Sequence, residues 1–382
     1  MTLVAVLFAN EFPLVITDSL LSQPDPEDYG TLSPLMESVD QRQGNGFKPV
    51  GLTRKFWILP DKTLFFYCGT IGTAQAFFDL LGDRMQRGEM LTRGLMIEVR
   101  DEMDQRMKPF SCITLSPPKV QDAQSEPLEF RAHTVEALGN FVEEDIAGYG
   151  YVLAIGTGAE PLLKLLKNSP RPPDGSEANK VLAALNAAAR ATLNYRSSES
   201  GLAGASSGGY FEVLMPWLFE KSFHWLMRGA AHVFLDICDA RTRLERLVVA
   251  QQLEDKTVVL AGTDCRAVVM SERIVFSTDE MYNVAIDGDR SKLAKFTKNV
   301  TIPISHISVA TFYGRRKFSC GHLAHAHTVS YGGDGPVATL MEYDDDFDRP
   351  DDLSPLLCFE DYSKGILTLK TRLQASKCPC CK

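Results

Sequence analysis

The sequence lacks an excess of basic charge and contains no long apolar run. Forty Lys and Arg residues against 49 Asp and Glu residues give a net charge of −9, which is unlike the basic surface that binds nucleic acid or an anionic membrane. The longest apolar runs, such as residues 3–9 and 152–155, are far shorter than the roughly 20 residues of a membrane-spanning helix. Residues 1–4 offer no basic region of a secretory signal. We expect a cytoplasmic protein without nucleic-acid or membrane partners.

The chain also lacks a dense cluster of cysteines of the kind that forms a small disulfide-bonded scaffold. The nine cysteines are odd in number and dispersed, so reduced thiols are expected. Hydrophobic residues make up 45% and charged residues 23% of the chain, which excludes disordered and collagenous proteins. Because a single core stops growing efficiently at about 250–300 residues, the 382 residues predict two domains or one heavily extended domain.

The first two thirds of the chain alternate between strand and helix patterns. Residues 2–8 and 13–19 predict a hairpin, and residues 56–59 and 63–68 predict a second one around the turn Pro60-Asp61-Lys62. The segment 23–51 is rich in Pro, Asp, Gly and Ser and predicts a surface excursion. Further predictions are helices around 76–85, 95–107, 160–167 and 177–195, and strands at 111–115, 151–155 and 210–215.

The last third of the chain is rich in strand patterns. The predicted strands are residues 257–262, 266–276, 300–313, 336–342 and 365–371, and the stretch 241–252 is the one helical candidate there, a link between the halves. We therefore predict one domain over residues 1–240 and a β-rich C-terminal domain over residues 255–382.

Thr2 is the first candidate for chemistry. Once Met1 is removed, its hydroxyl lies within reach of its own α-amine, whose pKa of about 7.7–8.0 suits a general base. Such a nucleophile also needs a nearby cation and a carboxylate that holds the cation in place. Asp18, at the end of the second predicted strand, can supply the carboxylate, and either Arg54 or Lys55 can supply the cation.

Four stretches in this order resemble the proteasome β-subunit and its bacterial relatives, a branch of the N-terminal nucleophile hydrolases. They are TLVAVLF…PLVITDS, RKFWILPDKTLFFYCGTIGTAQAFFDLL, YVLAIGTGAEPLLKLL and SSGGYFEV, within residues 2–215. The resemblance implies an α+β fold, a four-layer αββα sandwich of two antiparallel sheets. It also implies a threonine peptidase that cleaves peptide or protein substrates and assembles into homo-oligomeric rings through helix faces, here those around residues 77–85 and 95–107.

The resemblance also implies a role for individual residues. Thr2 matches the nucleophile, Asp18 the aspartate that ends the second strand, and Lys55 the lysine that opens the third. The remaining matches are Gly69 to the glycine whose amide stabilises the oxyanion, Thr157 to a serine near the nucleophile, and Ser207 to a late serine before two glycines.

The sequence departs from the family pattern in ways that leave an alternative open. Matching the apolar strand pattern instead puts Met1 in the position of the nucleophile, and alternation along a strand allows only one of Arg54 and Lys55 to point inward. The family's aspartate before the late serine is missing, with Asn194 and Glu199 the polar residues upstream. The alternative is a catalytically inactive scaffold or binding protein that acts through its C-terminal domain.

Two further motifs suggest ligands. Cys320, His322, Cys378 and Cys381 offer enough soft ligands for one structural zinc ion, although their spacing matches no standard zinc finger; no other cofactor is expected. The turn Gly156-Thr157-Gly158 before a predicted helix suggests an anion site, but it lacks the Gly-Lys-Ser/Thr ending of a phosphate-binding loop.

Overall fold

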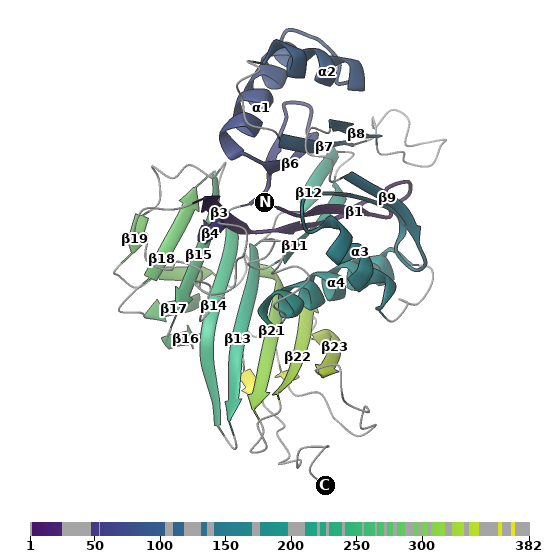
Figure 1. Ribbon diagram of the computed structural model, residues 1–382. Coiled ribbons are helices and arrows are strands. Elements are labelled where there is room, and N and C mark those ends of the chain that lie inside the picture. The colour runs from purple at the N-terminus through teal and green to yellow at the C-terminus, as the bar shows by residue number, and fades with distance from the viewer. Residues whose placement is uncertain are drawn as a thin grey trace. The chain divides into compact units, whose positions relative to one another are not determined.

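The computed structural model divides the chain into two compact units (Figure 1). Unit 1 comprises residues 1–28, 38–50 and 54–226, and unit 2 comprises residues 29–37, 51–53 and 227–382. The structure describes residues 2–24, 47–52, 54–103, 110–117, 131–135, 141–169, 176–197, 211–219 and 222–226, and from residue 229 to 370 the backbone of the strands. Each unit is considered separately below.

The larger sheet of unit 1 is antiparallel and has six strands in the order β12-β11-β2-β1-β10-β9. Every residue of its central strands β1 and β2 is buried because both faces are covered, and these strands are apolar apart from Thr17 and Asp18 at the end of β2. The bounds are β1 (Val4–Leu7), β2 (Leu14–Asp18), β9 (Phe141–Ile146), β10 (Gly150–Ile155), β11 (Phe211–Phe219) and β12 (Ser222–Leu226).

The smaller sheet of unit 1 is also antiparallel, with the order β5-β6-β7-β8. Its strands are β5 (Phe56–Ile58), β6 (Leu64–Gly69), β7 (Phe110–Ser116) and β8 (Arg131–Val135). The turn between β5 and β6 forms as predicted, since the Thr63 amide donates to Oδ1 of Asp61 over 3.0 Å. β6 contacts β1 of the larger sheet, and β7 contacts β10.

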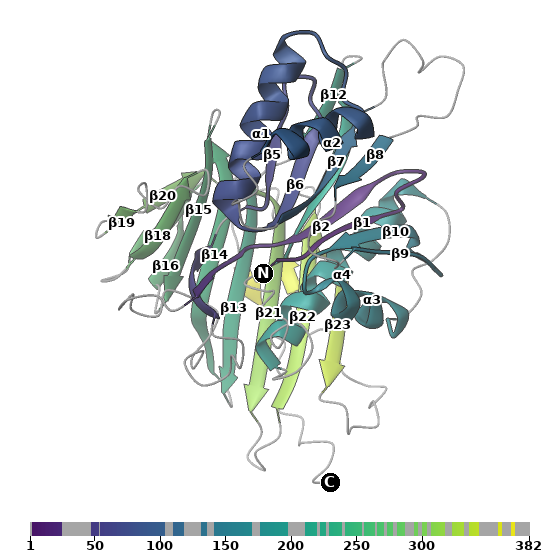
Figure 2. The same cartoon turned by 45° about the horizontal axis from the view of Figure 1, so that its top comes forward.

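Helices pack on both sheets of unit 1 (Figure 2). α1 (Ile71–Gln86) and α2 (Arg93–Glu102) lie on the smaller sheet, where their apolar faces join Phe65, Tyr67 and Phe110 in one core cluster. α3 (Ala159–Lys167) contacts β9, and α4 (Glu177–Ser197) contacts β2 and β11. Unit 1 is therefore a mixed α/β structure with two antiparallel sheets, as the sequence predicted at that level.

The predicted surface excursion is partly strand. β3 (Leu20–Pro24) pairs with β4 (Phe47–Leu52) as a two-stranded sheet at the two ends of that segment. Residues 25–46 lie outside the described residues. No helix in the described ranges is long and apolar enough to cross a membrane.

The described backbone of unit 2 consists of strands. Its main sheet has the order β19-β18-β15-β14-β13-β21-β22-β23, and β13 runs parallel to β21 while the other neighbours are antiparallel. The strands are β13 (Gly229–Cys238), β14 (Arg241–Leu253), β15 (Lys256–Thr263), β18 (Met281–Ile286), β19 (Ala294–Phe296), β21 (Ile307–Lys317), β22 (Leu323–Tyr331) and β23 (Pro336–Tyr343). Smaller sheets contain β16 (Arg266–Met270), β17 (Arg273–Ser277) and β20 (Val300–Pro303), and β24 (Cys358–Glu360) with β25 (Thr368–Lys370).

The predicted helix at residues 241–252 is wrong. This stretch is β14, which pairs with β13 on one side and β15 on the other. Its helix-favouring Arg, Leu, Glu and Gln residues give only a weak preference, and pairing with a strand on each side overrides it.

Candidate active site

Asp18 lies beside the start of the chain. It ends β2, is fully buried, and its Oδ1 accepts a hydrogen bond of 3.0 Å from the Leu3 amide. The Asp18 amide in turn donates to the Leu3 carbonyl oxygen over 3.0 Å. Thr2, the residue before Leu3, is only 2% exposed. The β1–β2 hairpin therefore places a buried carboxylate against the backbone of Leu3, the residue that follows the candidate nucleophile.

Lys55 brings a cation to the same place. Its side chain is buried, and Nζ donates a hydrogen bond of 2.7 Å to the carbonyl oxygen of Leu20, two residues after Asp18. Burial lowers the pKa of the Lys55 amine, while the nearby charges of Asp18 and Cys68 act in the opposite direction. The amine thus lies within electrostatic reach of the Asp18 carboxylate.

Arg54 has a different partner from its neighbour. Its guanidinium forms a buried ion pair with Glu212 on β11, at distances of 3.1 to 3.2 Å. Both side chains are buried, but they have different partners, Glu212 for Arg54 and the Leu20 carbonyl oxygen for Lys55. The pair precedes β5, so the alternation of a strand does not apply to it.

The glycine turn after β10 contacts the backbone of Thr2. Gly156 has φ +98°, and a Cβ atom placed on it would lie 1.9 Å from the Thr2 carbonyl oxygen and 3.5 Å from Cβ of Cys68. Only glycine fits this approach. Thr157 follows in the same turn and is half-buried, so the predicted serine-like position adjoins the residue that touches Thr2.

The end of β6 lies next to the glycine turn, where Cys68 adjoins Gly156. Cys68 is fully buried, and burial raises the pKa of its thiol to about 11 although hydrogen bonds to Ser111 oppose the shift. Gly69 is the last residue of β6, is half-buried and has φ +96°. Its amide is the predicted oxyanion donor, one residue after the thiol that adjoins Gly156.

The structure thus brings together the chain segments that contain five of the six predicted catalytic residues: Thr2, Asp18, Lys55, Gly69 and Thr157. Ser207 and Glu199 lie outside the described residues, as do the side chain of Asn194 and all four predicted zinc ligands, Cys320, His322, Cys378 and Cys381. Within the described part of the chain, no group of three His, Cys, Asp or Glu residues could hold a metal ion.

Two residues of this region, Glu212 and Gly156, were not among the residues predicted from the sequence. Glu212 lies in an otherwise apolar strand, and an acidic residue at such a position needs a buried partner, which was a usable indication. Gly156 was noted only as part of a glycine turn, because its contact with Thr2 depends on pairing between β1 and β10.

Comparison with known proteins adds no family assignment. No family model matches the chain, and no curated protein matches it.

Proposed function

We propose that unit 1 is a proteasome-like N-terminal nucleophile hydrolase in which Thr2 attacks the carbonyl carbon of a peptide bond. Cleavage of the bond between Met1 and Thr2 frees the α-amine, which takes the proton of the hydroxyl as the new C–O bond forms. The C–N bond of the substrate then breaks, the leaving amine takes that proton, and water hydrolyses the resulting ester. Removal of Met1 by hydrolysis precedes the reaction, and each later step uses groups of this chain and water.

The observation that carries the proposal is the buried Lys55 amine within electrostatic reach of Asp18, whose carboxylate is bonded to the Leu3 amide next to Thr2. A positive charge near a hydroxyl favours its ionised form, and burying an ammonium group is costly unless it is paired and hydrogen-bonded. Lys55 is held on the Leu20 carbonyl at 2.7 Å, while Asp18 is fixed on the Leu3 amide at 3.0 Å. These contacts support a site in which the cation and the carboxylate both act on Thr2.

Gly69 and Thr157 complete the proposed site. The Gly69 amide is the donor to the oxyanion, and one such donor is typically worth about 2.7–4 kcal/mol of transition-state stabilisation. Thr157 and Ser207 are proposed to assist near the nucleophile, as their matches in the resembling family do.

The packing of the helices supports a four-layer αββα sandwich as the fold of unit 1. α1 and α2 lie on the smaller sheet, α3 and α4 on the larger one, and the two sheets touch through β1 with β6 and β10 with β7. We propose further that the protein acts on peptide or protein substrates as a homo-oligomer, with the chemistry placed between the two sheets.

The test uses the purified full chain and a peptide vinyl sulfone, which alkylates an activated hydroxyl. Intact-mass analysis is expected to show loss of Met1, and peptide mapping is expected to show the adduct on Thr2. Thr2→Ala abolishes the adduct and Thr2→Ser retains it. Thr17→Val is the matched control, because Thr17 is another fully buried threonine of the hairpin and its loss leaves the adduct unchanged.

Retention of Met1 throughout the preparation, or an adduct that persists in Thr2→Ala, contradicts the proposal. Retained Met1 favours the alternative, a catalytically inactive scaffold or binding protein that acts through its C-terminal domain, whereas a persistent adduct assigns the reactivity to another side chain.

A further inference from the structure

Arg54 and Glu212 form a buried ion pair outside the proposed catalytic set. Nε of Arg54 donates to both carboxylate oxygens of Glu212, at 3.2 and 3.1 Å, and an Nη atom donates to Oε1 at 3.1 Å. The two side chains are only 5% and 6% exposed. The contact joins the residue that precedes Lys55 to β11 of the larger sheet, which pairs with β2.

The backbone of residues 54 and 55 is held from a second direction. The Tyr67 hydroxyl donates to the Arg54 carbonyl oxygen, and the Tyr67 amide donates to the Lys55 carbonyl oxygen, both over 3.2 Å. Tyr67 is itself buried and stacks on Trp57 with ring centroids 4.2 Å apart. The segment that presents Lys55 is therefore fixed by β6 through its backbone and by β11 through the Arg54 side chain.

We propose that the Arg54–Glu212 ion pair is a positioning pair, which sets the place of the Lys55 amine beside Asp18 by fixing the preceding residue against β11. The inference rests on the proposed function for its catalytic meaning. The structural part of the inference is that Glu212 determines the surroundings of Lys55. This part holds whether or not the protein is a hydrolase.

Geometry, rather than stability, is what such a pair supplies. Removing two charges from water costs about as much as their attraction returns, so a buried pair adds little net stability over an apolar replacement. Its forked hydrogen bonds do fix distance and angle. In a catalytic site a misplacement of about 1 Å can lower a rate by about 10²-fold, so a rigid anchor next to Lys55 has a use.

Thr17 provides a control at the same place in the sheet. It lies directly opposite Glu212 in the β2–β11 register and is fully buried. In the part of the chain that the structure describes, its hydroxyl oxygen has no hydrogen-bond partner. Thr17→Val therefore changes a buried polar side chain beside the ion pair while leaving the pair itself intact.

The experiment follows the Lys55 amine in the full chain by NMR, with ¹³C at Cε of lysine. The Lys55 resonance is the one lost in Lys55→Met. In the wild type its pKa is expected below that of the other lysines. Glu212→Gln and Arg54→Lys are expected to move the resonance and its pKa and to slow vinyl sulfone labelling of Thr2 by about 10- to 100-fold. Thr17→Val leaves both unchanged.

Two outcomes separate the inference from the proposed function. An unchanged Lys55 resonance and pKa in both Glu212→Gln and Arg54→Lys overturns the positioning role, whatever the labelling shows. A moved resonance in a protein whose Thr2 is never labelled keeps the positioning role and refutes the hydrolase. If Glu212→Gln fails to fold, Glu212→Asp keeps the charge but shortens its reach, and the same shift of the resonance is expected.

Discussion

Among single residues, Gly156 packs directly against the backbone of the candidate nucleophile. Its φ of +98° disfavours any side chain, and an added Cβ would overlap the Thr2 carbonyl oxygen at 1.9 Å. Gly156→Ala must shift the backbone of Thr2 or of the turn. We expect it to lower the free energy of unfolding by at least about 2 kcal/mol and to abolish labelling of Thr2.

Denaturant unfolding and vinyl sulfone labelling measure the two effects. Gly82→Ala is the matched control, because Gly82 lies inside α1 with nothing within 4 Å of an added Cβ. That change is expected to raise stability by about 0.5–1 kcal/mol and to leave labelling unaffected. Normal labelling in Gly156→Ala would show that the contact with Thr2 is not needed.

Asp18 and Lys55 are coupled through charge, and a double-variant cycle measures the coupling. Each of Asp18→Asn and Lys55→Met leaves the other buried group without its opposite charge and is expected to destabilise the protein. The double variant is expected to cost less than the sum of the two by about 0.5–3 kcal/mol. Strictly additive free energies of unfolding would mean that the carboxylate and the amine do not interact.

At the residue scale, the sequence indicated which segments would come together. The order of Thr2, Asp18 and Lys55 along the chain matches a known pattern, and the structure brings the segments that contain them close together. The partners of Arg54 and Gly156 were not found, because Glu212 and Thr2 meet them only through pairing between strands far apart in sequence. Residues that act through a distant segment leave little trace in the local sequence.

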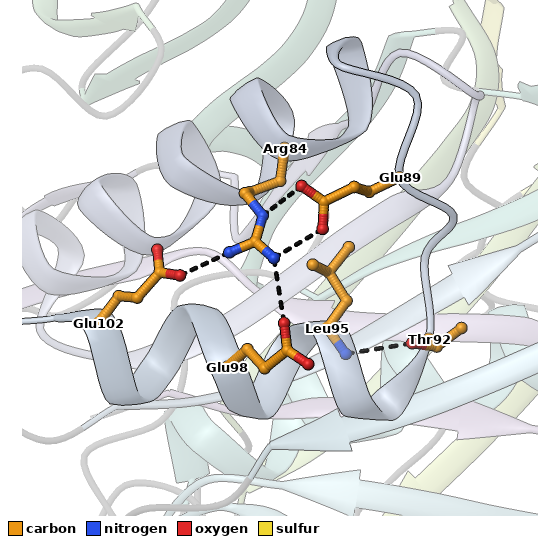
Figure 3. A network of polar contacts seen from close by, with 6 residues as sticks. All are labelled: Arg84, Glu89, Thr92, Leu95, Glu98 and Glu102. Atoms are coloured by element: carbon orange, nitrogen blue, oxygen red, sulfur yellow. Dashed lines mark hydrogen bonds and ion pairs between the residues drawn. The ribbon is translucent and has the colours of Figure 1, made fainter.

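At the scale of elements, the side chain of one arginine links α1 to α2. Figure 3 shows Arg84 near the end of α1 bonded to Glu89 in the connecting loop and to Glu98 and Glu102 on α2. α2 starts with Thr92, whose side chain accepts a hydrogen bond of 3.1 Å from the Leu95 amide. The cap fixes where α2 begins, and Arg84 fixes how it meets α1.

Arg84→Gln should lower Tm by a few degrees at low salt, because one cation serves three carboxylates. Its hydrogen bonds hold the pKa of Glu89 below its usual value. A carboxylate with a lowered pKa stabilises the fold above its unfolded pKa, and this stabilisation is lost as the pH falls through the folded pKa. The difference in Tm between wild type and variant should therefore be present at pH 7 and vanish at acid pH and in 1 M salt.

Thermal unfolding across pH and salt measures this difference. Arg100→Gln is the control, since among the described residues the Arg100 side chain pairs with Asp101 alone and both side chains are exposed; an isolated surface pair adds little. A difference in Tm for Arg84→Gln that stays the same at acid pH would assign the effect to packing of the arginine stem instead.

Periodicity predicted the elements of unit 1 well, for a physical reason. α1 and α2 each bury one face against a sheet, so apolar residues recur at helical spacing, and β1 and residues 14–16 of β2 are apolar because both faces are covered. β14 was mistaken for a helix because its stability comes from β13 and β15 on either side. The amino-acid composition of residues 241–252 does not indicate which strands pair with them.

At the scale of the whole molecule, packing within unit 1 restricts how copies could assemble. The helix faces that the sequence offered for ring contacts are used internally, since Phe77, Leu81, Met96 and Val99 are buried in the core over the smaller sheet. Among the described residues, the large apolar side chains that stay exposed are Leu80 at 37% and Met90 at 72%. Both belong to the α1–α2 hairpin or its loop.

If copies of the chain assemble through an apolar contact on this hairpin, that contact is expected to include these two side chains. We expect light scattering of the full chain to give a multiple of 42.3 kDa, and Leu80→Glu with Met90→Glu to lower that mass, because each puts a charge into a buried contact. Arg100→Gln on the same hairpin should leave the mass unchanged. A wild-type mass of one chain refutes the assembly, and a multimer that survives both glutamates places its contact elsewhere on the molecule.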